Sequence, residues 1–263
     1  MARGNAIRVL RQATLAIIAA ALLGGTWLTR TRATSWEETL WVTVYPVVAG
    51  DDEATARYVD RLTSESFAPL ADFVAREAGR YGIDLERPLR VDLGEPTSMP
   101  PLPPEAATPL RVMAWSLKLR WWTWRALKDQ PGPDPDIRLF AVYHDPVDGV
   151  ALPHSLGMKE SRIGIVHLFA SRRMRGSNQV IMVHELLHTL GATDKYDPAN
   201  NLPVFPAGYA EAEREPRYPQ RYAEVMGGRI PLAPDTAEIP ASLKKTRVGP
   251  ATAAELRWTD VEG

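Results

Sequence analysis

The chain has 263 residues, a formal net charge of −1, 45% hydrophobic residues and 24% charged residues. These values fit one enzyme-sized globular domain and leave no excess of basic residues for nucleic acid, so we expect no nucleic-acid partner. The sequence has no cysteine, which excludes disulfides and thiolate metal ligands.

An apolar segment opens the chain. Residues 12–29 are uncharged and rich in Leu, Ile and Ala, and arginines flank them on both sides. This length lies between a signal-peptide core and a short transmembrane helix, and the arginines before it predict a cytoplasmic amino end. We expect a single-pass anchor in the inner (plasma) membrane, with the rest of the chain periplasmic or extracellular. The alternative is secretion after signal cleavage near Ala33-Thr34-Ser35.

This boundary predicts two parts: residues 1–35 as cytoplasmic stub and anchor or signal segment, and residues 36–263 as one folded domain. The domain is predicted to begin with a strand at Leu40–Val48, after which Asp51 or Asp52 caps a helix that continues to about Tyr81. Further strands are expected at Pro88–Leu93, Ile137–Tyr143 and Arg162–Ala170, a proline-dense loop at Pro96–Pro109, and a last helix at Pro250–Trp258.

A helix with many tryptophans is predicted over Leu110–Lys128. Its four tryptophans alternate with lysines and arginines. We expect the tryptophans to pack on a sheet, because aromatic side chains supply much of a protein core. The mixture of tryptophan and basic residues is also typical of a helix that rests on a bilayer, and that alternative stays open.

The segment His184–Asp194 carries the spacing H-E-x-x-H. On a helix, positions four apart share one face, so His184 and His188 can direct two imidazoles at one metal ion while Glu185 lies beside it. Val183, Leu187 and Leu190 recur at helical spacing and predict the buried side. Ser177 or Asn178 is expected to cap the start of this helix and Gly191 to end it.

A catalytic zinc usually takes three protein ligands and one water, so one further ligand is expected nearby. Asp194 follows the turn at Gly191, and Asp197 is a rival. The longer pattern H-E-x-x-H-x-x-G-x-x-D resembles the motif of the metzincin zinc peptidases, whose last position is His, or Asp in some bacterial members. This resemblance implies that His184, His188 and Asp194 bind Zn²⁺.

Metzincins also carry a methionine turn beneath the zinc, and Ala223–Gly228 resembles it, with Met226 as the floor residue. The resemblance spans residues 163–229. It implies an α+β, metzincin-like (zincin) catalytic domain with a mixed twisted sheet, an active-site helix and a Met-turn, preceded here by the N-terminal transmembrane or signal helix. The helix expected between the second and third strands departs from the simplest form of that plan.

The resemblance implies a zinc metalloendopeptidase, a hydrolase that acts on peptide or protein. Zinc lowers the pKa of its bound water toward about 7, and Glu185 is expected to accept the proton as general base and pass it to the leaving amine. In metzincins the substrate pairs with an edge strand, for which Ile163–Phe169 is the candidate. Among the tyrosines between the zinc motif and the methionine turn, Tyr222 is the candidate oxyanion stabiliser.

Two alternatives stay open. One is a non-catalytic, zinc-containing binding or sensory module, and the other is a zinc amidase that acts on cell-wall peptide. Glu185 favours an enzyme, because a structural zinc site needs ligands but no base. Outside the motif, His144 and His154 are expected in hydrogen-bonded or surface roles, and His167 could line the substrate strand. The sequence specifies neither the physiological substrate nor the oligomeric state.

Overall fold

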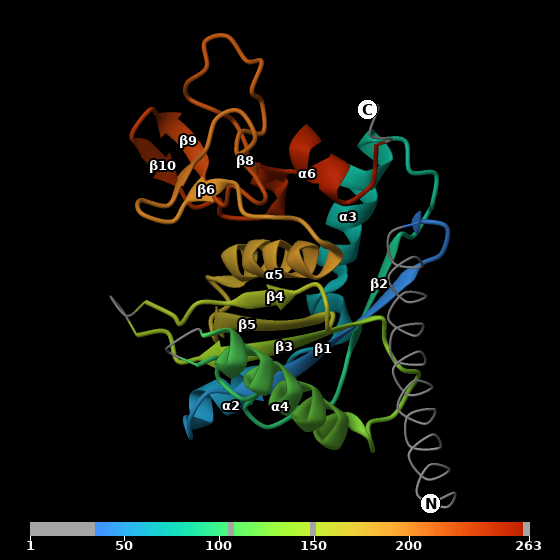
Figure 1. The fold of residues 1–263 in the computed structure, drawn as a ribbon. Coiled ribbons are helices and arrows are strands. Elements are labelled where there is room, and N and C mark those ends of the chain that lie inside the picture. The colour runs from blue at the N-terminus through green and yellow to red at the C-terminus, as the bar shows by residue number, and fades with distance from the viewer. Residues whose placement is uncertain (1–34, 105–107, 148–150, 260–263) are drawn as a thin grey trace, which may run out of the picture.

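The computed structural model describes residues 35–104, 108–147 and 151–259. Over these ranges the chain forms a mixed α+β fold around a twisted five-stranded sheet (Figure 1). The predicted anchor at residues 12–29 lies outside the described residues. Among the helices within them, none is both long and apolar enough to cross a bilayer.

The central sheet has the strand order β2-β1-β3-β5-β4. Its first four strands are parallel, and β4 pairs antiparallel with β5 at one edge. The predicted bounds of the first strand are confirmed. The second and third predicted strands differ by one residue at one end, and the fourth differs by one residue at each end. No pattern in the sequence predicted β4. The strands are β1 (Leu40–Val48), β2 (Leu89–Leu93), β3 (Ile137–His144), β4 (Leu156–Met158) and β5 (Ile163–Phe169).

Helices cover both faces of this sheet. Figure 1 shows α5 on one face and α4 on the other. The larger core joins α3 and α5 to the sheet, and the smaller core lies beneath α4, around Phe140 and Val142. The helices are α2 (Glu53–Val59), α3 (Ala68–Arg80), α4 (Pro109–Leu127), α5 (Arg175–Leu190) and α6 (Pro250–Glu255), with short 3₁₀ turns η1 (Ser64–Ser66) and η2 (Leu243–Lys245).

The prediction of one helix from Asp51 or Asp52 to Tyr81 is wrong. The chain instead forms α2, η1 and α3. The cap at Asp52 is confirmed, since its carboxylate accepts a hydrogen bond of 2.6 Å from the Thr55 N–H. Pro69 explains the restart of the helix: it lies in the first turn of α3, where a missing N–H leaves no helical hydrogen bond unmade.

The chain after α5 forms short strands and loops beside that helix (Figure 1). Buried Glu77 of α3 accepts a hydrogen bond from the Val248 N–H at 3.1 Å, and the Trp36 indole donates to the Leu256 carbonyl at 2.6 Å. These bonds hold the segment around α6 against α3 and against the residues just before β1. The short strands are β6 (Tyr196–Asp197), β7 (Leu202–Pro203), β8 (Ala223–Glu224), β9 (Ile230–Ala233), β10 (Thr236–Glu238) and β11 (Thr246–Arg247).

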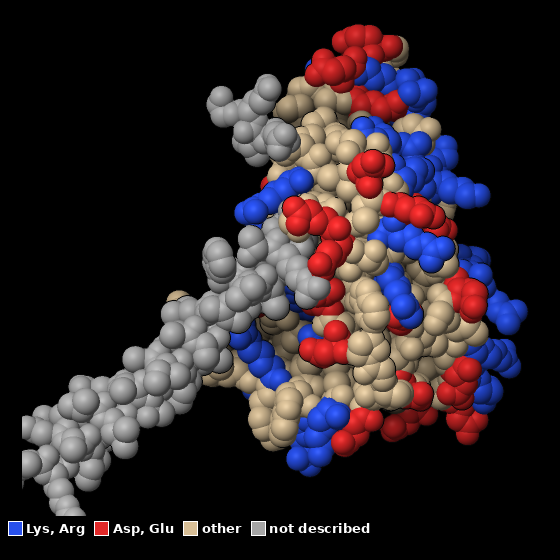
Figure 2. Space-filling model, turned by 90° about the vertical axis from the view of Figure 1, so that its right-hand side faces the viewer, with Lys and Arg blue, Asp and Glu red and all other residues tan. Residues whose placement is uncertain are grey.

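Acidic and basic side chains are interspersed on the face of the molecule in Figure 2. Neither sign forms one continuous patch there. This agrees with the nearly balanced composition of 31 Lys and Arg against 32 Asp and Glu.

Candidate metal centre

Helix α5 carries the H-E-x-x-H motif. As predicted, Val183, Leu187 and Leu190 are buried, and Gly191 ends the helix with a left-handed φ of 108°. The predicted cap at Ser177 or Asn178 is wrong, because the helix begins one turn earlier, after Met174. The Asn178 amide instead donates to the Phe169 carbonyl at 2.9 Å, which fixes α5 against the end of β5.

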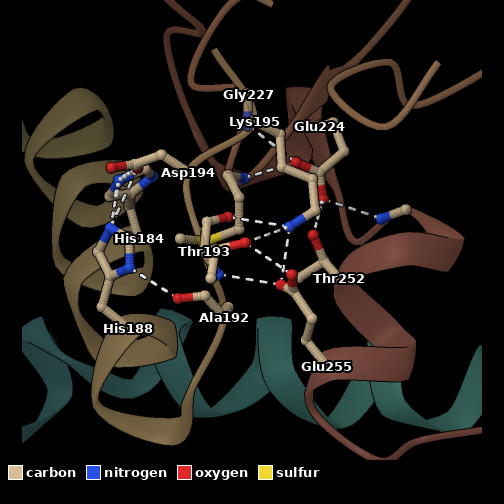
Figure 3. Close-up of polar contacts among 12 residues, drawn as sticks. His184, His188, Ala192, Thr193, Asp194, Lys195, Glu224, Gly227, Thr252 and Glu255 are labelled. Atoms are coloured by element: carbon tan, nitrogen blue, oxygen red, sulfur yellow. Dashed lines mark hydrogen bonds and ion pairs between the residues drawn. The ribbon is translucent and has the colours of Figure 1, made fainter. Parts of the chain in front are cut away.

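Three ligand atoms converge at the carboxyl end of α5 (Figure 3). Asp194 Oδ1 lies 3.1 Å from the Nε2 atoms of both His184 and His188. The two Nε2 atoms are themselves 3.1 Å apart, and all three atoms lie within 4.8 Å of one another. Gly191 makes this possible, because its left-handed backbone turns the chain so that Asp194 faces the helix.

The other ring nitrogen of each histidine contacts a backbone carbonyl. His184 Nδ1 lies 2.9 Å from the Val225 oxygen, and His188 Nδ1 lies 2.8 Å from the Ala192 oxygen. A carbonyl can only accept, so both Nδ1 atoms carry protons and both Nε2 atoms present lone pairs in the neutral rings. Three electron-rich atoms in such close contact form a group that could hold a metal ion.

His184 and Asp194 shift the pKa of each other. Burial lowers the pKa of His184, but the Asp194 and Glu185 carboxylates and the Val225 carbonyl outweigh it and raise that pKa overall. Burial raises the pKa of Asp194, yet the two adjacent imidazoles outweigh it and hold that pKa well below its usual range. Asp194 is therefore ionised at neutral pH, the form that a metal ligand requires.

Glu185 lies next to the trio and is almost fully buried. Its Oε2 atom has no hydrogen-bond partner among the described residues. Burial raises the pKa of this carboxyl, while the neighbouring histidines and the Gly157 N–H of β4 oppose the rise. A buried carboxyl oxygen without a hydrogen-bond partner is unfavourable, so a polar group is expected to bind beside Oε2.

Strand β4 packs directly on α5 at this point. A Cβ atom added to Gly157 would lie 2.2 Å from the Glu185 carbonyl oxygen and 2.5 Å from His188 Cβ. Only glycine allows so close an approach, which brings the sheet edge to the metal centre.

The turn at Ala223–Gly228, predicted as a methionine turn, lies next to the trio: the Val225 carbonyl contacts His184, and Met226 is completely buried. Buried Glu224 holds the turn: its carboxylate accepts hydrogen bonds from the Met226 and Gly227 N–H groups at 2.7 and 2.8 Å. The same carboxylate accepts from the Gly249 N–H at 3.1 Å and the Thr252 hydroxyl at 2.8 Å. Burial raises the pKa of Glu224, and the four donors oppose that rise. Figure 3 shows Glu224 between the turn and α6.

The remaining sequence candidates lie apart from the trio. The Asp197 carboxylate accepts from the Ala199 N–H at 2.9 Å within its own turn, and the metal-ligand group contains Asp194 but not Asp197. The Tyr222 ring lies 4.2 Å from the Arg247 guanidinium. Tyr196 is nearer: its ring centroid is 6.3 Å from that of His184, and burial together with the Asp194 charge raises the pKa of its hydroxyl.

The prediction that Ile163–Phe169 is the substrate-pairing edge strand is wrong. This strand is β5, which is paired with β3 on one side and with β4 on the other. The edge nearest the metal centre is β4. His167 also lies away from the trio, since it shares its side of β5 with Ile163 and Ile165, which pack under α4. Its Nδ1 is 2.8 Å from His144 Nε2, and His154 is exposed.

Sequence reasoning missed the residues that support the ligands. Glu224 could have been noticed, because a carboxylate just before Met226-Gly227 can accept hydrogen bonds from the N–H groups of the turn. Glu255 and Gly157 gave no local signal, since their partners lie far along the chain. Glu255 accepts hydrogen bonds from the Thr193 N–H and from Lys195 Nζ, one on each side of Asp194, at 2.9 and 2.7 Å (Figure 3).

No protein-family model and no curated protein matches this sequence. Among solved structures, wild-type OgpA from Akkermansia muciniphila has 16% identity and a TM-score of 0.41 over 82% of this chain and 59% of that chain. Catalytically inactive OgpA from the same organism, in complex with an O-glycopeptide (glycodrosocin) substrate, has 14% identity and a TM-score of 0.40 over 85% and 62%. A chain from a chaperone–substrate complex has 13% identity and a TM-score of 0.36 over 84% and 34%.

This chain therefore spans about three fifths of the two OgpA chains, at 59% and 62%. At these similarities, the assignment of a function depends on the geometry of the site.

Proposed function

We propose that this chain is a zinc-dependent metallopeptidase with a metzincin-like catalytic domain, in which Glu185 is the general base. The observation that carries the proposal is the convergence of His184 Nε2, His188 Nε2 and Asp194 Oδ1 within 4.8 Å beside a buried carboxyl group. Two neutral imidazoles and one carboxylate form a ligand set that suits catalytic zinc and leaves a position for water.

Zinc in this site would supply a Lewis acid and lower the pKa of its bound water toward about 7. Glu185 accepts a proton from the attacking water at its unpartnered Oε2 atom, because burial raises the pKa of that carboxyl. The water oxygen bonds to the carbonyl carbon of the peptide, the C–N bond breaks, and Glu185 donates the proton to the leaving amine nitrogen. Met226 and Glu224 hold the floor beneath the ligands, and Tyr196 is better placed than Tyr222 to donate a hydrogen bond to the substrate oxyanion.

The edge strand β4 is the proposed platform for the peptide. Within the described part of the chain it pairs only with β5, so its outer backbone groups can pair with an extended substrate. Gly157 fixes this strand against Glu185 and His188, which would hold the paired peptide beside the base and the metal.

We also propose that residues 12–29 anchor the enzyme as a single-pass protein in the plasma membrane, with residues 36–263 in the periplasm or outside the cell. Mass spectrometry of the protein from both the membrane fraction and the soluble exported fraction tests this. An intact amino terminus is expected, and a chain that begins near Ser35 would establish secretion after signal cleavage instead.

The test of the activity compares the full chain with Glu185→Gln, whose amide has nearly the same shape but cannot take the proton. We expect about one zinc per chain in both proteins. Cleavage of a mixed peptide library should fall at least about a hundredfold in the variant. Loss of zinc is expected for His188→Ala. If Glu185→Gln cleaves as fast as the wild type, Glu185 is not the base.

The peptide library also separates the alternative functions, because it contains unmodified peptides, O-glycosylated peptides and cell-wall peptides. Cleavage of cell-wall peptides alone would identify a zinc amidase. Bound zinc without cleavage of any member, in wild type and variant alike, would favour a binding or sensory module.

A further inference from the structure

Helix α4 carries two apolar sides. The inner side packs on the sheet: Leu119 and Thr123 are buried, and the Trp122 ring lies 5.0 Å from Phe140. The outer side carries a second stripe whose members recur every three or four residues and therefore lie along one line of the helix. This outer stripe comprises Leu110, Met113, Leu117, Trp121 and Trp124, with exposed fractions of 74, 56, 62, 58 and 64%.

The expectation that all four tryptophans pack on the sheet is therefore half right. Trp115 and Trp122 pack against the smaller core, whereas Trp121 and Trp124 point away from it. Single exposed apolar side chains are common in soluble proteins, but a continuous stripe of five large ones marks an interaction surface.

The charges on α4 identify the partner. Between Pro109 and Leu127 the charged residues are all basic, although acidic and basic residues are almost equally frequent in the whole chain. Arg111, Lys118 and Arg125 are exposed and recur every seven residues, so they follow one flank of the outer stripe. The Arg125 guanidinium lies 5.9 Å from the Trp121 ring, where the basic flank borders the outer stripe.

We propose that the outer stripe of α4 docks on an anionic phospholipid bilayer, with the helix parallel to the membrane surface. Leucine, methionine and tryptophan side chains enter the boundary between headgroups and acyl chains, and the basic flank contacts the phosphates. This surface is distinct from the metal centre and depends neither on the peptidase activity nor on residues 12–29.

The docked orientation has a geometric consequence. Figure 1 shows α4 and α5 on opposite faces of the sheet. A membrane beneath α4 therefore leaves His184 and His188 on the side of the sheet that faces away from the lipid.

The absence of cysteine allows a site-specific test in the full chain. Leu117→Cys places a single thiol in the outer stripe, and Ile239→Cys places one at a control position that is 60% exposed and remote from α4. Each thiol carries an environment-sensitive fluorophore, and quenching by iodide is measured with phosphatidylglycerol vesicles, with phosphatidylcholine vesicles and without lipid.

We expect phosphatidylglycerol to protect the label at position 117 from quenching several-fold and to leave the label at position 239 unchanged. The triple variant Arg111→Gln/Lys118→Gln/Arg125→Gln should raise the lipid concentration needed for this protection on the order of a hundredfold, because each basic residue contributes a factor of about five. A label at position 117 that stays accessible with phosphatidylglycerol overturns the proposal. Protection without lipid also overturns it, because another protein surface would then cover the stripe.

Discussion

The Lys195 ammonium lies 2.7 Å from Glu255 Oε2, and this ion pair joins α6 to the segment that carries Asp194. The Lys195 side chain is only 5% exposed, and Glu255 also accepts hydrogen bonds from the Thr193 N–H and hydroxyl. Residues on both sides of Asp194 are thus fixed by one carboxylate that lies about sixty residues later in the chain.

Glu255→Gln should lower the affinity for zinc by about tenfold or more, because partners of metal ligands orient them. Titration against a competing chelator measures this, with exposed Glu238→Gln as the control. An affinity equal to that of the wild type would show that Asp194 is positioned without Glu255.

The Glu255 interaction should also depend on pH. Burial raises the pKa of Glu255, but hydrogen bonds from Lys195 and Thr193 outweigh it and hold that pKa below its usual value. The stabilisation is therefore complete above the usual carboxyl value of 4.5 and is lost as the pH falls through the lower folded value. Urea unfolding should show this acid-dependent loss in the wild type and a weaker one in Glu255→Gln.

Asp194→Ala should abolish tight zinc binding, whereas Asp197→Ala should bind zinc like the wild type. The physical reason is that Asp194 Oδ1 contacts both imidazoles while Asp197 completes a local turn. Metal content after dialysis distinguishes the two variants. A greater loss from Asp197→Ala would reverse the assignment of the third ligand.

Gly157→Ala should destabilise the protein by about 1–3 kcal/mol, because the new methyl group would collide with the Glu185 carbonyl and His188. Gly79→Ala is the matched control: its Cβ would have no neighbour within 4 Å, and alanine favours the helix by up to about 1 kcal/mol. Urea unfolding of the two variants should move in opposite directions. Equal behaviour would mean that β4 does not press on α5.

His167 should make the fold sensitive to mild acid. Burial, together with the neighbouring His144, lowers its pKa from the usual 6.5 to about 4. As the pH falls, the unfolded chain binds the proton first, so stability is complete above about 6.5 and declines until about 4. His167→Gln should weaken this decline in urea unfolding between these values, and exposed His154→Gln should not. An identical slope in His167→Gln would exclude His167 as the titrating group.

Local patterns predicted the parts of the fold that depend on local physics. The strand at Leu40–Val48 and the helix around His184 follow from hydrophobic periodicity, and the turn at Gly191 follows from the backbone freedom of glycine. The break between α2 and α3 was missed because the apolar pattern continues across it, although Pro69 marks the place.

Contacts between distant segments could not be predicted in the same way. Strand β4 has three residues, too few to show a period, so β5 was assigned the edge position that β4 occupies. The carboxylates of Glu224 and Glu255 resemble ordinary surface acids in the sequence. Their partners become visible only when α6 is placed beside the turn and the Asp194 segment.

The position of α6 also orders events during synthesis. Glu224 receives two of its four hydrogen bonds from Gly249 and Thr252, and Asp194 is flanked by the contacts of Glu255. A nascent chain that still lacks these residues has the H-E-x-x-H helix but lacks the contacts that hold Asp194 and the turn at Met226 in place. The geometry of the centre therefore depends on residues that are added to the chain about sixty residues after Asp194.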